Sequence, residues 1–113
     1  MPAPYCPSRG DVVWLNFEPQ AGHGQSGRRP ALAVSPESYN RKVGLALFCP
    51  ITSHAKGYPF EVALPPGCEV SGVVLADQVK NLDWKARDSR PACRLPAREL
   101  QEVLARLSTL LVG

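Results

Sequence analysis

Proline is the residue that most constrains the fold of this chain. It occurs 12 times in 113 residues, about twice its usual frequency of ~5%. Each proline fixes one backbone angle and lacks an N–H donor, so it interrupts helices and is tolerated mainly at turns and strand ends. The prolines divide residues 1–96 into short segments, where we expect short strands rather than long helices. The length is that of one domain, so we take residues 1–113 as a single domain.

Several of these short segments favour β-strands, because they alternate apolar and polar residues or are rich in β-branched ones. They are 10–17, 29–36, 45–53, 60–65, the apolar first half of 72–84, and a short last segment, 93–96. Residues 37–44 are expected to form a helical turn or loop. Residues 18–28 and 54–59 are polar and contain glycine, which is typical of loops.

The pattern changes to a helical period after Pro96. Apolar residues recur three and four positions apart, which predicts one stripe along an amphipathic helix that ends at Gly113. The stripe consists of Leu100, Val103, Leu104, Leu107, Leu110 and Leu111. Short strands followed by one helix predict a mostly β fold: a small, mostly antiparallel barrel with a C-terminal helix packed on it.

Charge and cysteine content narrow the classes of protein. The net charge of +3 permits an anionic partner without demanding one. No apolar run is long enough to span a membrane, and the first residues lack the apolar core of a signal peptide, so we expect a cytoplasmic protein. The four cysteines (Cys6, Cys49, Cys68 and Cys93) form no C-x-x-C pair. We therefore expect four reduced thiols, two or three of them in the core, and no metal site.

The loop sequence "GHGQSGRRP", residues 22–30, has the glycine spacing of a nucleotide-binding motif. Its context contradicts that interpretation, because Pro30 and the residues after it predict a strand where such motifs open a helix. Arg28 and Arg29 also stand where a P-loop has lysine and a hydroxyl residue. Arg29 remains to be explained: it could bind an anion at the start of a strand, or form a salt bridge to Glu18 or Glu37.

Two further clusters of polar residues follow predicted strands. Thr52 and Ser53 end the segment 45–53, and Lys56 follows them, which suits a phosphate or, alternatively, an ordinary capped turn. Asp77, Gln78, Lys80 and Asn81 gather where 72–84 turns polar. Trp84, Lys85 and Arg87 come next, as expected for single-stranded nucleic acid binding. Trp84 could equally be a core residue.

The strand, loop and helix motifs together resemble a known family. The stretches "GDVVWLNFEPQAGHGQSGRRPALAVSP", "CPITSHAKGYPFEV", "GVVLADQVKNLDWKAR" and "LQEVLARLSTLLVG" are similar, in order and spacing, to the MazF/PemK/Kid toxins of bacterial toxin–antitoxin pairs. The most specific motifs are "GRRPALAVSP", "KGYPFEV" and "LADQVK" followed by tryptophan. The resemblance extends over nearly the whole chain.

The resemblance implies a fold, an activity and partners. The fold is the small SH3-like barrel with helices that is shared by the CcdB and PemK toxins. The activity is that of an endoribonuclease, an mRNA interferase that cuts single-stranded RNA at short motifs. It needs no metal or cofactor and leaves a 2′,3′-cyclic phosphate and a 5′-OH. The protein would be a homodimer, and a MazE-like antitoxin would cover the RNA site with an acidic tail.

The resemblance also assigns roles to residues. The catalytic arginine and threonine of the family fall on Arg29 and Thr52, and a loop histidine that takes part in proton transfer in Kid-like toxins falls on His23. Asp77 occupies the aspartate position of the "DQ" motif and would orient Arg29 or a base edge. The residues expected to face RNA are Gln25, Arg28, Ser53, Lys56, Asp77, Gln78, Lys80 and Arg87.

The chain departs from the family pattern at one loop position. Several MazF proteins have a glutamate where this chain has Gly24, so His23 or another neighbour would take over any role of that carboxylate. The main alternative is a CcdB-like toxin that binds and poisons a topoisomerase. Toxins of that kind act through a tryptophan near the C-terminus, whereas this chain ends "STLLVG". A plain SH3-like interaction module is the third interpretation, and it would leave Arg29 without a role.

Overall fold

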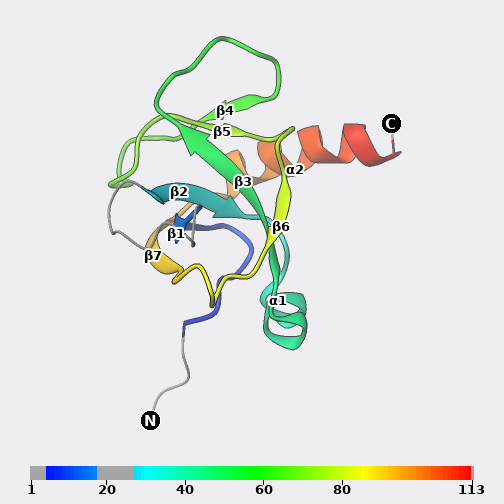
Figure 1. The fold of residues 1–113 in the computed structure, drawn as a ribbon. Coiled ribbons are helices and arrows are strands. Elements are labelled where there is room, and N and C mark those ends of the chain that lie inside the picture. Colours follow the sequence, from blue (N-terminus) through cyan, green and yellow to red (C-terminus); the bar gives the residue numbers. More distant parts are fainter. Residues whose placement is uncertain (1–4, 18–26, 113) are drawn as a thin grey trace.

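The computed structural model describes residues 5–17 and 27–112, and within them the chain forms one curved antiparallel sheet with two helices. The elements are β1 (Asp11–Asn16), β2 (Arg28–Ala33), α1 (Glu37–Val43), β3 (Ala46–Thr52), β4 (Glu61–Ala63), β5 (Val73–Leu75), β6 (Lys80–Leu82), β7 (Arg90–Arg94) and α2 (Ala97–Val112). In Figure 1, α2 crosses behind the sheet, while α1 and the β4–β5 hairpin lie toward opposite ends of β3. In the described ranges no helix is long and apolar enough to cross a membrane.

The mostly β prediction with a C-terminal helix is confirmed, and two segments differ most from their predictions. The apolar first half of 72–84 is the predicted strand, β5, and the polar half contains a second strand that was not predicted, β6; both pair with β3. The chain leaves the sheet between them at residues 76–79, where it turns polar. The last strand, predicted at 93–96, is β7 at Arg90–Arg94, because Pro96 and the helix after it end the strand earlier.

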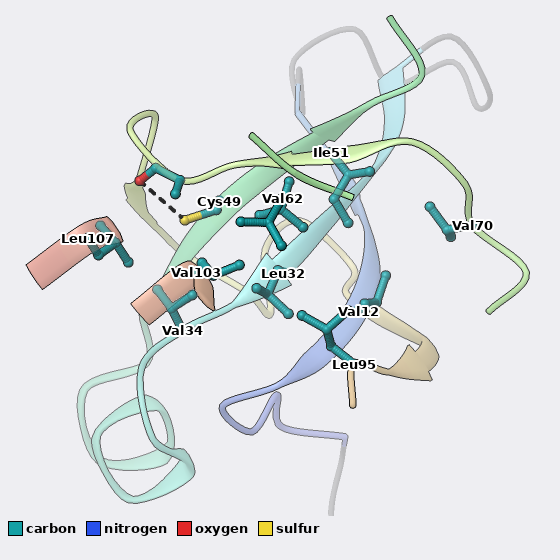
Figure 2. Packing of buried hydrophobic residues seen from close by; sticks show 12 residues of the cluster. Val12, Leu32, Val34, Cys49, Ile51, Val62, Val70, Leu95, Val103 and Leu107 are labelled. Atoms are coloured by element: carbon teal, nitrogen blue, oxygen red, sulfur yellow. Dashed lines mark hydrogen bonds between the residues drawn. The ribbon is translucent and has the colours of Figure 1, made fainter. Parts of the chain in front are cut away.

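The sheet is open rather than a closed barrel. The strand order is β4-β5-β3-β2-β1-β7, with β6 beside the first half of β3, and among the described residues no ladder joins β4 to β7. Two core clusters fill its two faces. Val12, Leu32, Cys49 and Ile51 belong to one cluster, which α2 covers with Val103 and Leu107, as Figure 2 shows.

The second cluster lies on the other face of the same strands. It contains Val13, Leu15, Ala31, Ala33, Phe48 and Trp84. Trp84 is 6% exposed and its indole N–H donates to the Asn40 carbonyl at 2.9 Å. The alternative in which Trp84 stacks on nucleic acid is therefore wrong, and the tryptophan is a core residue.

The helical stripe packs for only part of its length. Val103 and Leu107 are buried, and Leu100 and Leu104 pack against the same cluster. Leu110 and Leu111 were predicted to continue the stripe, but they are 51% and 78% exposed, because the last turns of α2 extend past the sheet (Figure 1). An apolar helix end is thus left uncovered in the single chain.

Two of the four cysteines are free thiols, as predicted, and the other two are not. Cys6 and Cys49 are buried free thiols. Burial raises the pKa of both, and that of Cys49 reaches about 12 with a smaller contribution from the Asp77 carboxylate. The expectation of four reduced thiols is wrong, since Cys68 and Cys93 form a disulfide. It joins the β4–β5 connection to β7, which lie at opposite ends of the strand order, and so links the open sheet covalently.

Candidate active site and RNA-binding surface

The register of β2 and β3 directs Arg29 and Thr52 to the same face of the sheet. The two strands pair Ala31 with Pro50 and Leu32 with Cys49. The ladder ends at Ala31, and the same register carried two residues further aligns Arg29 with Thr52, although Arg29 is not among the residues that line the cavity at Thr52. Opposed residues of an antiparallel pair point to the same face of the sheet, so the exposed guanidinium and the half-buried hydroxyl lie on one face, beyond the edge of the second core cluster.

The salt-bridge alternative for Arg29 is not supported at Glu37. The Glu37 carboxylate accepts from Arg41 at 2.6 Å, and this hydrogen bond holds the pKa of Glu37 below its ordinary value. Glu18, the other proposed partner, lies outside the described residues. No ion pair joins Arg29 to Asp77 in the part of the chain that the structure describes, so the predicted orienting role of Asp77 toward Arg29 has no contact behind it there.

A cavity of about 480 Å³ opens beside Thr52. Its lining comes from the end of β3, the loop after it, and the β5–β6 connection. It consists of Thr52, His54, Lys56, Tyr58, Glu61, Leu75, Asp77 and Gln78. Four predicted residues, Thr52, Lys56, Asp77 and Gln78, therefore share one hollow although 26 positions separate the first from the last. The lining supplies one lysine, two carboxylates, an imidazole, an amide and hydroxyl groups beside Leu75. Hydrogen-bonding groups of this kind can contact the bases of an RNA strand, and Lys56 can contact a phosphate.

The Thr52 hydroxyl is oriented by its own loop. Its oxygen accepts a hydrogen bond from the His54 backbone N–H at 3.1 Å, which leaves its proton available to donate. Gly72, with a φ of +124°, lets the chain before β5 pass directly against the Thr52 carbonyl, where a Cβ would collide. The hydroxyl of Thr52 is thus held by a hydrogen bond and its carbonyl by the close approach of Gly72. Ser53, also predicted to face RNA, is exposed, and its hydroxyl lies 3.3 Å from the His54 ring nitrogen Nδ1.

Lys80 lies on the same face of the sheet as Thr52. It is paired with Phe48 on β3, four residues from Thr52 or about 13 Å along the strand. Its side chain is exposed. A cation at that separation suits a neighbouring phosphate of a bound strand rather than the phosphate at Thr52 itself.

Two predicted arginines are not brought to the cavity. Arg28 alternates with Arg29 to the opposite face, donates to the Asp88 carbonyl at 2.9 Å and pairs with the Asp88 carboxylate at 3.5 Å. Arg87 donates to the carbonyls of Asn16 and Phe17 at 3.1 and 2.9 Å, where β1 ends. Both hold the two ends of the glycine-containing loop to the turn at 83–89. Their contact with RNA stays a prediction.

His23 and Gln25 lie outside the described residues, so the structure places neither of them. In the described ranges no three His, Cys, Asp or Glu side chains gather closely enough to hold a metal ion. The sequence reasoning missed His54 and Tyr58, which line the cavity. The signal available for Tyr58 was an aromatic residue between glycine and proline in a polar loop.

The chain is similar to known proteins over nearly its whole length. Residues 8–111 match a family model described as a PemK-like, MazF-like toxin of type II toxin–antitoxin systems. The chain is 45% identical over 107 residues to the endoribonuclease toxin MazF of Escherichia coli K12, covering 95% of this chain and 96% of that protein.

Solved structures give the same result for the fold. The crystal structure of MazF (Form-I) from Deinococcus radiodurans superposes with a TM-score of 0.86 and 55% identity, covering 97% of this chain and 100% of the other. The MazE–MazF structure (Form-I) from the same organism gives a TM-score of 0.87 and 49% identity with the same coverage.

Proposed function

The chain belongs to the PemK-like, MazF-like toxin family of type II toxin–antitoxin systems, and from this premise we propose that it cuts single-stranded RNA with Arg29 and Thr52. Identity of 45% to an endoribonuclease toxin over 95% of its length makes it an endoribonuclease toxin too. The observation that supports the proposed site is the β2–β3 register, which directs Arg29 to the same face of the sheet as Thr52, and Thr52 lines the cavity.

The chemistry suits these two side chains. The ribose 2′-OH attacks the adjacent phosphorus, the bond to the 5′-oxygen breaks, and the products are a 2′,3′-cyclic phosphate and a 5′-OH. The proton from the 2′-OH leaves to a base, and a proton reaches the departing 5′-oxygen. Negative charge grows on the non-bridging oxygens meanwhile. Arg29 can donate two aligned N–H bonds to those oxygens, and Thr52 can donate its free O–H.

We propose that His23 transfers the protons, because it occupies the position of the loop histidine in the family motif. An arginine keeps its proton under nearly all conditions, so Arg29 is a poor base and serves as donor and positive charge. An imidazole both accepts and gives a proton readily, which suits a carrier between the two oxygens. Asp77 and Gln78 in the cavity would contact base edges, and Lys56 and Lys80 would contact phosphates.

The topoisomerase-poisoning alternative is not favoured. It calls for a tryptophan near the C-terminus, whereas both tryptophans of this chain, Trp14 and Trp84, lie before α2 and Trp84 is buried. The partner that we propose besides RNA is a MazE-like antitoxin with an acidic tail. Such a tail would compete with RNA for the same exposed cations, among them Arg29, Lys56 and Lys80. We place both events in the cytoplasm, where the RNA is.

The proposed function predicts cleavage without a divalent metal. A long single-stranded RNA incubated with the purified protein in EDTA should give discrete fragments that carry a 5′-OH, because Arg29 and Thr52 supply the charge stabilisation. Fragment ends are mapped by testing whether a kinase can label them before phosphatase treatment. Ends bearing a 5′-phosphate, or cleavage that EDTA abolishes, would contradict the metal-free mechanism.

We also propose that the protein is a homodimer, and that the uncovered end of α2 lies in the interface. Leu110, Leu111 and Val112 are 51%, 78% and 84% exposed in the single chain. Leu111→Glu would place a charge in that apolar contact, so we expect its dimer dissociation constant to rise at least about tenfold, measured by light scattering against concentration. Ser108→Glu, on an exposed turn of the same helix, is the matched control. Equal dimer stability in both variants would move the interface elsewhere.

A further inference from the structure

Tyr58 presents an exposed aromatic ring in the cavity that contains Thr52. The residue is 59% exposed and contributes to the cavity wall with Leu75, Gln78 and His54. The sheet does not cover it, in contrast to the buried Trp84. In Figure 1 the loop that carries it is the green arch between the end of β3 and β4.

The backbone around Tyr58 is held although the ring is exposed. The Glu61 carboxylate accepts from the backbone N–H groups of Lys56 and Gly57, each at 3.0 Å. The Tyr58 carbonyl accepts from the Glu61 N–H at 3.1 Å. From α2, the Arg106 guanidinium donates to the Pro59 carbonyl at 2.8 Å. Four consecutive residues, 56–59, are therefore tied to β4 or to α2.

A held backbone with an exposed ring is the arrangement that base stacking requires. Stacking contributes most when the residue that carries the ring is already positioned before binding, because ordering it at that moment would cost part of the gain. The cavity volume of about 480 Å³ falls in the range of small-molecule sites, roughly 300–1,000 Å³. Its rim carries hydrogen-bonding groups on His54 and Gln78 that can meet the edge of a base.

We propose that Tyr58 is the stacking platform for one unpaired base of the RNA, adjacent to the phosphate that Arg29 and Thr52 hold. This inference rests on the proposed function and adds a recognition element to it. Arg106 acts as a positioning residue, because it is absent from the cavity lining and acts through the Pro59 carbonyl of the loop, while Glu61 both holds the loop and lines the cavity. His54 and Gln78 meet the edge of the stacked base, and the ring supplies affinity for its face.

The test combines a side-chain variant with a substrate variant. The substrate is a single-stranded oligoribonucleotide that the unaltered protein cuts once, with a second series carrying one abasic nucleotide at each position near the cut. We expect Tyr58→Ala to lower kcat/KM roughly 10- to 100-fold, mainly through KM, and Tyr58→Phe to stay within about threefold, since the π face is kept.

Coupling between the two changes decides the result. At one abasic position, the kcat/KM of the unaltered protein should fall by about the factor that Tyr58→Ala causes on the intact substrate. On that same abasic substrate, Tyr58→Ala should have nearly the same kcat/KM as it has on the intact substrate. Tyr39→Ala, an exposed tyrosine on α1, is the matched control and should cut normally. The stacking role of Tyr58 would be wrong if the losses from Tyr58→Ala and from the missing base multiply at every abasic position. It would also be wrong if Tyr58→Ala has normal kcat/KM.

The same cleavage assay, with intact and abasic oligonucleotides, tests the positioning role of Arg106. Arg106→Ala should lower kcat/KM on the intact oligonucleotide, and most of this loss should vanish on the coupled abasic substrate, which a general loss of structure would not produce. Arg98→Ala, an exposed arginine on the same helix, should be neutral on both. Failure of the unaltered protein to cut any RNA would contradict the proposed function, whereas cutting without coupling would contradict only the platform.

Discussion

Arg29→Ala should cut RNA roughly 100- to 1,000-fold more slowly than the unaltered protein, the loss typical when one preorganised donor to a developing oxyanion is removed. The loss should appear in kcat, because the charge that Arg29 meets grows only in the transition state. Single-turnover cleavage of a labelled oligoribonucleotide measures it directly. Thermal unfolding should be unchanged, since the Arg29 side chain is exposed.

The arginine's geometry can be separated from its charge. Arg29→Lys keeps the charge but loses the two parallel N–H donors, so it should recover only a minor part of the rate. Arg98→Ala, an exposed arginine at the start of α2, is the matched control and should leave the rate unchanged. Near-normal cleavage by Arg29→Ala would remove Arg29 from the catalytic centre.

Thr52 extends the same test to the other strand. Thr52→Val keeps the shape of the side chain and removes the hydroxyl whose oxygen the His54 N–H orients. Because both donors would serve the same non-bridging oxygens, we expect the double variant Arg29→Ala, Thr52→Val to lose less than the product of the single losses. Losses that simply multiply would mean that the two side chains act on separate events.

The local signals in the sequence predict most of the fold. Alternation and β-branched residues mark the positions of β1 to β5, and the helical period locates α2 to within a residue or two at each end. The end of the apolar stripe is wrong for a physical reason. Periodicity reports which face of a helix is apolar, but it does not report where the sheet beneath that helix ends, and Leu110 and Leu111 extend past it.

The sequence predicts only those site residues that strand pairing or a motif position can identify. Arg29 and Thr52 are far apart in sequence, but Arg29 begins one predicted strand and Thr52 lies near the end of the next, and antiparallel pairing of these strands directs both to one face. Tyr58 carries no comparable signal, because its significance comes from Glu61 and Arg106 holding its loop. Arg28 and Arg87 were expected to face RNA on charge and position. Only the structure shows the Asp88 and β1 carbonyl groups that they contact.

The disulfide could not be predicted from spacing. Cys68 and Cys93 are 25 residues apart and lie in elements that are not neighbours in the strand order. They meet because the curvature of the sheet brings the β4–β5 connection back toward β7, which is a property of the whole fold. Cytoplasmic thiols are usually reduced, and this general rule predicts free thiols at Cys68 and Cys93 instead of a disulfide.

Reducing or removing this disulfide should destabilise the protein by about 3 kcal/mol, as expected for a cross-link that closes a loop of this length. In a chain of 113 residues that corresponds to a melting temperature roughly 10 to 20 °C lower. The double variant Cys68→Ser, Cys93→Ser should melt at the lower temperature with or without reductant. The unaltered protein should move between the two temperatures when reductant is added.

Thiol labelling supplies the control, because the two remaining cysteines are protected for a separate reason. Cys6 and Cys49 are buried, and the raised pKa of each keeps it protonated and unreactive near pH 8. The unfolded thiols ionise at their ordinary pKa, so the contribution of Cys49 to stability is complete below that value and declines as the pH rises toward about 12. Alkylation of the native protein at pH 8 should therefore modify no cysteine before reduction, and Cys68 and Cys93 alone after it. Modification of both without reductant, or a melting temperature that reductant does not change, would show that curvature alone holds the two ends of the sheet together.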